Sequence, residues 1–161
     1  MARKLSFLLG LILLVTLTAR AQDKVELFGG YSYERFNSSP SRNLNGWEIS
    51  GQYKFAGFLG ALADVDAHYG SQVRSTSFMI GPQVSVPFRI SPFVHVLVGI
   101  GHIRAGGISD NSFSTALGGG VDMKLVPAIS WRVIQADDVV TRYFGGTQHS
   151  ARISTGIIFR F

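Results

Sequence analysis

The clearest periodic pattern in the chain lies in its last eleven residues, Ala151–Phe161 (ARISTGIIFRF). Counted back from Phe161, every second residue is apolar apart from one threonine, whereas the intervening positions carry Arg152 and Arg160. A period of two residues is that of a β-strand with one apolar and one polar face. The segment is therefore predicted to be a strand that separates two different environments.

The same alternation recurs upstream, in segments separated by short stretches rich in Gly, Pro, Asn and Ser. Between Leu44 and Phe55, for example, Trp47 and Tyr53 belong to an apolar set that alternates with a polar set containing Glu48. The pattern predicts an all-β chain. Its eight strands are expected at Val25–Phe36, Leu44–Phe55, Phe58–Tyr69, Ser75–Phe88, Ile90–Arg104, Ser112–Leu125, Ala128–Tyr143 and Ala151–Phe161.

Strand length and polarity together favour a membrane barrel. A transmembrane β-strand needs about ten residues, apolar toward lipid and polar toward the interior. The links after the second, fourth and sixth strands are read as short turns, and the other links as longer loops of up to about seven residues. That asymmetry and an even strand count are typical of outer-membrane barrels. The prediction is an eight-stranded antiparallel up-and-down transmembrane β-barrel, with the short turns and both chain ends on the periplasmic side.

The seventh strand fits this pattern least well. Ile129, Trp131 and Val133 read as outward, but the same parity would place Gln135 and Asp137 in lipid. A charge on the lipid face costs roughly 2–4 kcal/mol at the membrane midplane and little near the interface. Either a β-bulge shifts the register after Val133, or these residues lie at the outer rim.

The first 21 residues have the features of a cleavable signal peptide. A basic start precedes an apolar segment of 13 residues, Leu5–Leu17, and Thr18–Ala21 ends in an A-x-A pattern. As a helix, those 13 residues would span about 20 Å, less than the roughly 30 Å of a hydrocarbon core. We therefore expect a cleaved signal peptide at residues 1–21 and a barrel domain at residues 22–161.

The charge balance of the exported chain does not indicate a nucleic-acid partner. Without Arg3, Lys4 and Arg20, the remaining 12 basic and 10 acidic side chains leave a net charge of +2. The chain has no cysteine, so it neither needs nor risks disulfides in an oxidising compartment.

Three segments resemble a known family. The opening VELFGGYSYERF, the glycine-rich LGGGVDMKL and the closing RISTGIIFRF resemble the eight-stranded outer-membrane β-barrel domains typified by the barrel of outer-membrane protein A. The resemblance covers residues 22–161 and implies architecture more than activity. It also implies that Ile157, Phe159 and Phe161 form the C-terminal signal read by the barrel assembly machinery.

The inward parity assigns eleven charged residues to the interior. Such charges must be paired or hydrated, so we expect a salt-bridge network that fills the lumen or, alternatively, gates a narrow ion path. An open diffusion pore is disfavoured because eight strands enclose a space that side chains fill. The predicted network comprises Glu26, Glu34, Glu48, Lys54, Asp64, Asp66, Asp122, Lys124, Arg132, Arg152 and Arg160.

Aromatic and arginine residues gather near the predicted strand ends. Tyr33, Trp47, Tyr69 and Tyr143 are expected at the outer ends, and Phe55, Phe58, Phe93, Phe159 and Phe161 at the periplasmic ends, as two girdles. Arginines at the outer rim are predicted to bind lipid phosphates through bidentate contacts, the alternative being an ordinary solvated rim. They are Arg35, Arg42, Arg74, Arg104 and Arg142.

No catalytic, cofactor or metal site is predicted. The four histidines, His68, His95, His102 and His149, have no acidic partner placed by spacing and no metal-ligand spacing. The expected protein is a monomer whose partners are outer-membrane lipids, including lipopolysaccharide, with no nucleic acid. Two alternatives are a soluble lipocalin-like barrel with an apolar interior and a small lipid-modifying enzyme.

Overall fold

The computed structural model describes residues 24–37, 41–143 and 145–161. The predicted signal peptide lies outside these residues. Within the described part of the chain, no helix is long and apolar enough to cross a membrane.

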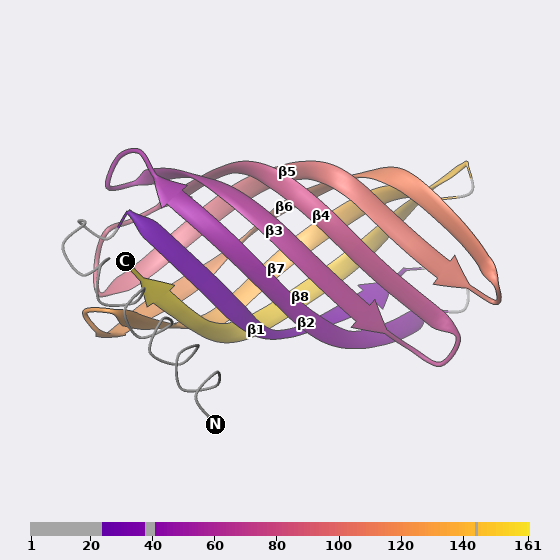
Figure 1. Ribbon diagram of the computed structural model, residues 1–161, viewed down its shortest axis with the longest axis horizontal. Helices are drawn as coiled ribbons and strands as arrows, with labels where there is room; N and C mark the ends of the chain where they lie inside the picture. Colours follow the sequence, from indigo (N-terminus) through magenta and orange to yellow (C-terminus); the bar gives the residue numbers. More distant parts are fainter. Residues whose placement is uncertain (1–23, 38–40, 144) are drawn as a thin grey trace, which may run out of the picture.

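The eight strands close into a single antiparallel barrel in which every strand pairs with its neighbours in sequence, and β8 pairs with β1 (Figure 1). The eight-stranded all-β prediction is therefore confirmed. The strands are β1 (Val25–Phe36), β2 (Arg42–Lys54), β3 (Leu59–Tyr69), β4 (Val73–Ser85), β5 (Ile90–Ala105), β6 (Ile108–Val126), β7 (Ile129–Tyr143) and β8 (Gly146–Arg160).

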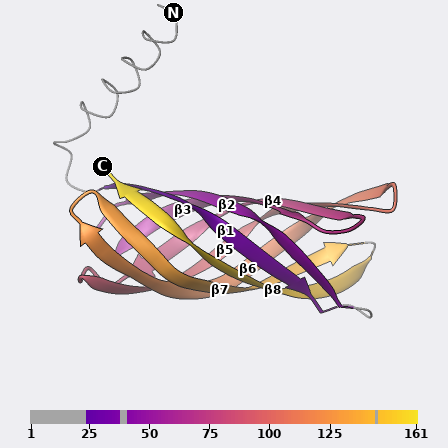
Figure 2. The ribbon, with the colours of Figure 1, turned by 90° about the horizontal axis from the view of Figure 1, so that it is seen from below.

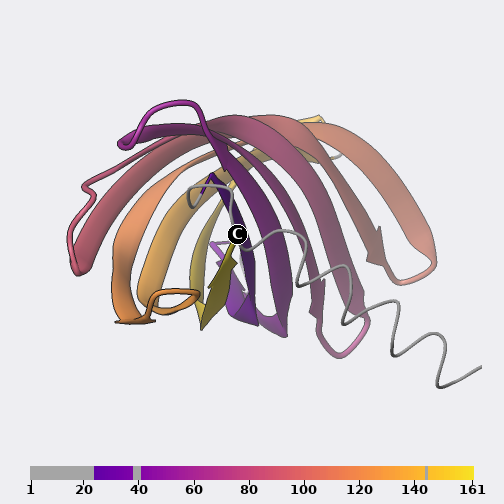
Figure 3. The ribbon, with the colours of Figure 1, turned by 60° about the vertical axis from the view of Figure 1, so that its left-hand side comes forward.

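The barrel is elongated, and its strands run obliquely to the long axis (Figures 1 and 2). Figure 3, which brings one end forward, shows the strands following one another around a curved wall. The closing seam extends to the last residue: Val25 N donates to Phe161 O (3.2 Å), and Phe161 N donates to Val25 O (2.9 Å). Phe161 thus continues the β1–β8 ladder.

The two ends of the barrel carry different links. Lys24, Phe161 and the links β2–β3, β4–β5 and β6–β7 lie at one end, which we call the turn end (left in Figure 1). The links β1–β2, β3–β4, β5–β6 and β7–β8 lie at the other, which we call the hairpin end.

The predicted asymmetry in link length is wrong. Residues 106–107 alone join β5 to β6, whereas residues 55–58 join β2 to β3 at the turn end. The polar segment 109–111 was read as loop, but it pairs with residues 102–104. Backbone hydrogen bonds between two strands do not require apolar side chains. The β5–β6 pairing therefore continues through polar residues that the hydrophobic pattern assigns to a loop.

Polarity is inverted relative to a soluble protein. Leu117 and Ile100 on the outer wall are 64% and 61% exposed, whereas Arg152 and Glu48 inside are each 1% exposed. Alternation along every strand produces this arrangement, because successive side chains point to opposite faces. The lipocalin-like alternative, which requires an apolar interior, is contradicted by these charges.

A β-bulge in β7 resolves the irregularity of that strand. The β7–β8 register shifts between Arg132 and Gln135, and Val133 and Ile134 both face outward. The hydroxyl of Thr155 on β8 donates to the carbonyl of Arg132 (2.9 Å), which stabilises the distorted backbone. Of the two interpretations that the sequence left open, the bulge is correct, and Gln135 lies inside.

Candidate functional site

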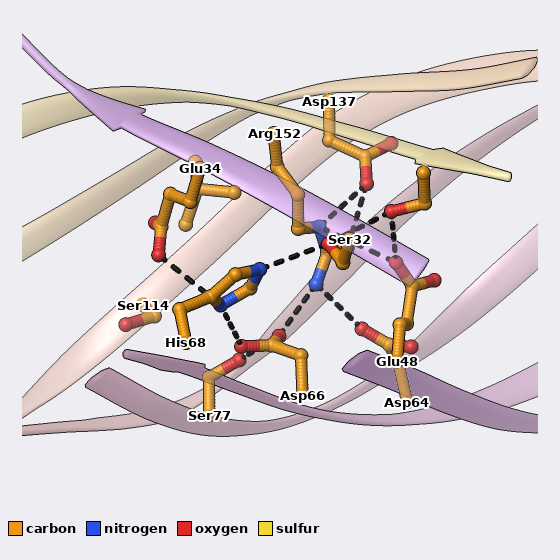
Figure 4. Close-up of polar contacts among 12 residues, drawn as sticks. Ser32, Glu34, Glu48, Asp64, Asp66, His68, Ser77, Ser114, Asp137 and Arg152 are labelled. Carbon is orange, nitrogen blue, oxygen red and sulfur yellow. Dashed lines mark hydrogen bonds and ion pairs between the residues drawn. The ribbon is translucent and has the colours of Figure 1, made fainter. Parts of the chain in front are cut away.

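Arg152 of β8 lies at the centre of the interior, surrounded by carboxylates (Figure 4). Its Nη1 contacts Asp64 Oδ2 (2.9 Å) and Asp66 Oδ2 (2.5 Å). Its Nε and Nη2 both donate to Asp137 Oδ2 (2.9 and 2.6 Å), and Nε lies 3.9 Å from Glu48 Oε2. One guanidinium thus contacts acids of three other strands: the adjacent β7, where Asp137 is its register partner, and the non-adjacent β2 and β3.

His68 forms a second cluster beside this centre. Its Nε2 lies 2.9 Å from Ser32 Oγ, and its Nδ1 lies 3.1 Å from Asp66 Oδ1 and 3.3 Å from Glu34 Oε2. The expectation that histidine has no acidic partner is therefore wrong for His68. Asp66 and His68 are two residues apart on one strand, so they share a face; that spacing was the available signal.

These residue types match those of a nucleophilic triad, but the arrangement has no room for a substrate. Ser32 and His68 have no exposed surface. The interior cavity lined by Glu34 and Asp66 has a volume of about 10 Å³, which is the space of a single water molecule. The cluster can hold a proton or a water molecule and stabilise the packed interior.

His95 and Asp137 meet across an intervening strand. His95 Nε2 lies 2.9 Å from Asp137 Oδ1, although β6 separates their strands and places Gly118 opposite both. A Cβ on Gly118 would lie 1.8 Å from that same carboxylate oxygen. Glycine at this position therefore creates the space in which the two side chains touch, as close packing across a tight barrel requires.

The same device recurs between β1 and β3. Gly46 is the register partner of both Ser32 and His68, which contact each other. A Cβ on Gly46 would lie 1.9 Å from the carbonyl oxygen of Ala67. An inward glycine between two polar residues on flanking strands thus marks an interior contact.

Arg132 forms a bidentate pair with Asp122, with Nε–Oδ1 and Nη2–Oδ2 distances of 2.8 and 3.1 Å. Its guanidinium also lies between two rings, 4.5 Å from the centre of Phe28 and 4.3 Å from that of Phe93. Placing Phe93 in the periplasmic girdle is wrong, because it faces the interior and is buried. Phe28 of β1, an apolar residue buried on the inward face, provides the other ring.

Fewer charged side chains meet at the turn end of the interior. Glu26 Oε1 accepts from Lys54 Nζ (2.6 Å) and Arg160 Nε (2.7 Å). Lys54 is partly exposed there. Lys124 is exposed. Its register partner, Ser130, is buried, so Lys124 keeps the inward parity but lies at the solvent-open end of β6.

Carboxylates outnumber the fixed cations in the interior. Four buried or half-buried basic groups, Lys54, Arg132, Arg152 and Arg160, are set against seven buried acids. Asp137, His68 and His95 belong to this interior but were missing from the predicted network. The buried acids are Glu26, Glu34, Glu48, Asp64, Asp66, Asp122 and Asp137.

An apolar cluster closes the interior at the hairpin end. Phe36, Leu44, Val73 and Ile103, from four different strands, pack together and are buried, with Ala105 against them. An ion or solute moving along the barrel axis would meet this apolar layer next to the charged one.

The five predicted rim arginines are all exposed near the hairpin end, but they do not form one belt. Arg74 of β4 and Arg104 of β5 are direct register partners. Arg35, Arg42 and Arg142 lie on β1, β2 and β7. The three residues of the predicted assembly signal lie at the turn end, with Ile157 and Phe159 exposed on the outer wall and Phe161 half-buried.

Neither a scan against protein-family models nor a search of curated protein sequences gave a match. Solved structures, in contrast, match over most of their length. Neisserial surface protein A is 15% identical with a TM-score of 0.68, covering 86% of this chain and 97% of that one. Ail of Yersinia pestis, solved in complex with the heparin analogue sucrose octasulfate, is 16% identical with a TM-score of 0.59, covering 84% and 97%.

The N-terminal β-barrel domain of Pseudomonas aeruginosa OprF is 11% identical with a TM-score of 0.56, covering 86% of this chain and 98% of that domain. At these identities the likeness establishes the fold. The chain therefore has the fold of the eight-stranded outer-membrane barrels, as its resemblance to them implied.

Proposed function

We propose that this protein resides in a bacterial outer membrane and acts there as a structural or surface-interaction barrel with at most weak pore activity. One observation carries the proposal: large apolar side chains are exposed on the wall of the barrel, while charged side chains such as Glu48, Asp64 and Arg152 are buried inside. Large exposed apolar areas on a soluble monomer are rare. Here the exposed set occurs on every strand and includes Ile49, Phe78, Val96, Ile100, Leu117 and Ile153.

The contents of the interior support a closed barrel. The Arg152 centre crosses the lumen, and the cluster around Phe36 and Leu44 caps it at the hairpin end. A second interior cavity, lined by Glu26 and Arg132 among others, is also only about 10 Å³. Such packing favours a structural role over transport, and the inaccessible Ser32–His68 pair supports a non-enzymatic one.

The hairpin end is proposed to face the cell exterior and to contact anionic outer-leaflet lipids, including lipopolysaccharide, through the five rim arginines. Guanidinium groups bind phosphate in a bidentate manner. Ail, which shares this fold, was solved with a polyanion, which is consistent with anionic ligands for such barrels. If replacement of all five arginines by glutamine leaves lipopolysaccharide association unchanged, this part of the proposal fails.

We propose that the two ends of the chain direct export and assembly of the barrel. Residues 1–21 would direct export and be removed. Ile157, Phe159 and Phe161 would present the C-terminal strand to the barrel assembly machinery, after which the protein would remain monomeric. Phe161 Cα lies at the barrel seam, where the last strand meets β1.

The test is cell fractionation followed by gel electrophoresis with and without boiling. Recovery in the outer-membrane fraction, with migration that changes on boiling, is the expected result. Recovery from the soluble periplasm, with a single migration position, would contradict the proposal.

A further inference from the structure

The outer wall of β4 and β5 carries two facing arginines at the hairpin end. Arg74 and Arg104 face outward and stand directly opposite each other in the antiparallel register. Like charges at such positions destabilise a sheet. A doubly charged anion between the two guanidinium groups would reverse the sign of this interaction.

Tyr69 holds the Arg74 side chain of this pair in place. The Arg74 guanidinium lies 4.9 Å from the ring centre of Tyr69, and its Nη2 lies 3.4 Å from the Tyr69 hydroxyl. Both arginines line an open cleft of about 490 Å³ together with Tyr69, Gln72 and the glycines of the β5–β6 turn.

The backbone around the cleft is unusual. Gln72 has a φ of 119°, a conformation that side-chain-bearing residues rarely adopt. Its carbonyl accepts from Gly106 N (3.3 Å), which ties the tip of the β3–β4 hairpin to that of the β5–β6 hairpin. Strained positions of this kind cluster at ligand sites.

Below the arginines, the polarity of the wall changes in steps along the same two strands. The next outward pair is Thr76 and His102, and the pair after that is Phe78 and Ile100. Phe78 and Ile100 are both exposed. The wall therefore offers two cations, then two polar groups, then an apolar surface.

The spacing of these steps fits a lipid molecule. Four residues along a strand span about 13 Å, and a strand tilt of 35–45° reduces this to about 10 Å along the membrane normal. That depth is comparable to a headgroup layer. A phosphate at the arginine pair would thus place acyl chains against Phe78 and Ile100.

We propose that Arg74, Arg104 and Tyr69 form a specific site for a phosphomonoester-bearing membrane lipid, whose acyl chains lie along the β4–β5 wall. This inference rests on the proposed membrane location and narrows the five rim arginines to one pair. A phosphomonoester matches the site because its two negative charges can engage both guanidinium groups.

The experiment uses the full barrel reconstituted in phosphatidylcholine vesicles with spin-labelled lipids. Electron paramagnetic resonance then gives the association of spin-labelled phosphatidic acid, a phosphomonoester, relative to spin-labelled phosphatidylcholine. The R74Q/R104Q variant is expected to lose about tenfold in this relative association constant. The control is R89Q/K124Q, which removes the same charge from two exposed positions at the turn end, outside the five rim arginines, and is expected to retain the preference.

Each outcome decides the proposal. Equal losses in both double variants, or no preference in the parent protein, would overturn it in favour of unspecific charge attraction. Inorganic phosphate that abolishes the preference at millimolar concentration would show that the acyl chains contribute nothing, which also contradicts a lipid site. Heat-modifiable migration is measured for every variant, so a failure to fold or insert, which would count against the proposed function, is distinguished from a failure of the lipid site.

Discussion

Two arginines of β8 face the same interior and yet occupy different settings. Arg152 lies in the middle of the barrel among four carboxylates from three other strands. Arg160 lies at the turn end, where it shares one carboxylate, Glu26, with Lys54, whose side chain is 16% exposed. Both arginines are buried, so each depends on its protein partners. They differ in how many acids rely on them: several rely on Arg152, whereas Glu26 has a second cation beside Arg160. Arg152 is therefore expected to contribute much more to the stability of the barrel than Arg160, although both are arginines on the inward face of β8.

The largest effect is expected from Arg152→Met. The substitution leaves Asp64, Asp66 and Asp137 buried without their shared cation, and removal of one partner of a buried ion pair costs roughly 3–5 kcal/mol. Urea unfolding in lipid vesicles measures the change in the free energy of unfolding. A loss below about 1 kcal/mol would mean that the centre is hydrated and that the contrast with Arg160 does not exist.

The double variant R152M/D137N sharpens this result. Because Asp137 accepts two hydrogen bonds from Arg152 at one oxygen, Oδ2, neutralising it should recover part of the stability lost in R152M. Groups in one network are not additive, and coupling energies of about 0.5–3 kcal/mol are typical. If the change in unfolding free energy of the double variant equals the sum of the changes of R152M and D137N, the two side chains contribute independently of each other.

An intermediate effect is expected from Gly118→Ala. The new methyl group would meet Asp137 Oδ1 at 1.8 Å and the Ala136 carbonyl oxygen at 2.6 Å, so the His95–Asp137 contact must move. Overpacking of this kind costs about 1–3 kcal/mol. The matched control is Gly29→Ala, a strand glycine whose Cβ would meet nothing within 4 Å. Equal stability of the two variants would contradict the role assigned to Gly118.

The smallest effect is expected from Arg160→Gln. Lys54 still pairs with Glu26, so no buried acid loses its last cation, and the loss should be about 1.5 kcal/mol or less, as for one hydrogen-bonded contact. The same urea titration provides the value. A loss as large as that of Arg152→Met would show that Lys54 does not replace Arg160 as the partner of Glu26.

The alternation of apolar and polar residues predicted the fold and most of the charged residues that face inward. It could do so because this alternation is visible within each strand, without knowledge of the other strands. The Arg152–Asp64 contact joins residues 88 positions apart. Which acid meets which arginine depends on the stagger of strands around the barrel, and alternation within one strand does not contain that information.

The errors have equally specific causes. Asp137 was missed because the bulge after Arg132 reverses the parity of the rest of β7. Phe93 was assigned by its position near a strand end, although the neighbouring outward valines of β5 already placed it inside. Loop lengths were misread because hairpin ladders continue through polar residues.

The most direct test of the central claim uses the two tryptophans of the unmodified chain. Trp47 and Trp131 lie on the outer wall, on β2 and β7, and are 40% and 38% exposed. Their fluorescence is compared after folding into vesicles with ordinary and with acyl-brominated lipids, since bromine quenches tryptophan on contact. Strong quenching in the brominated vesicles is predicted. Unchanged fluorescence in a folded, vesicle-bound protein would show that the apolar wall does not face lipid.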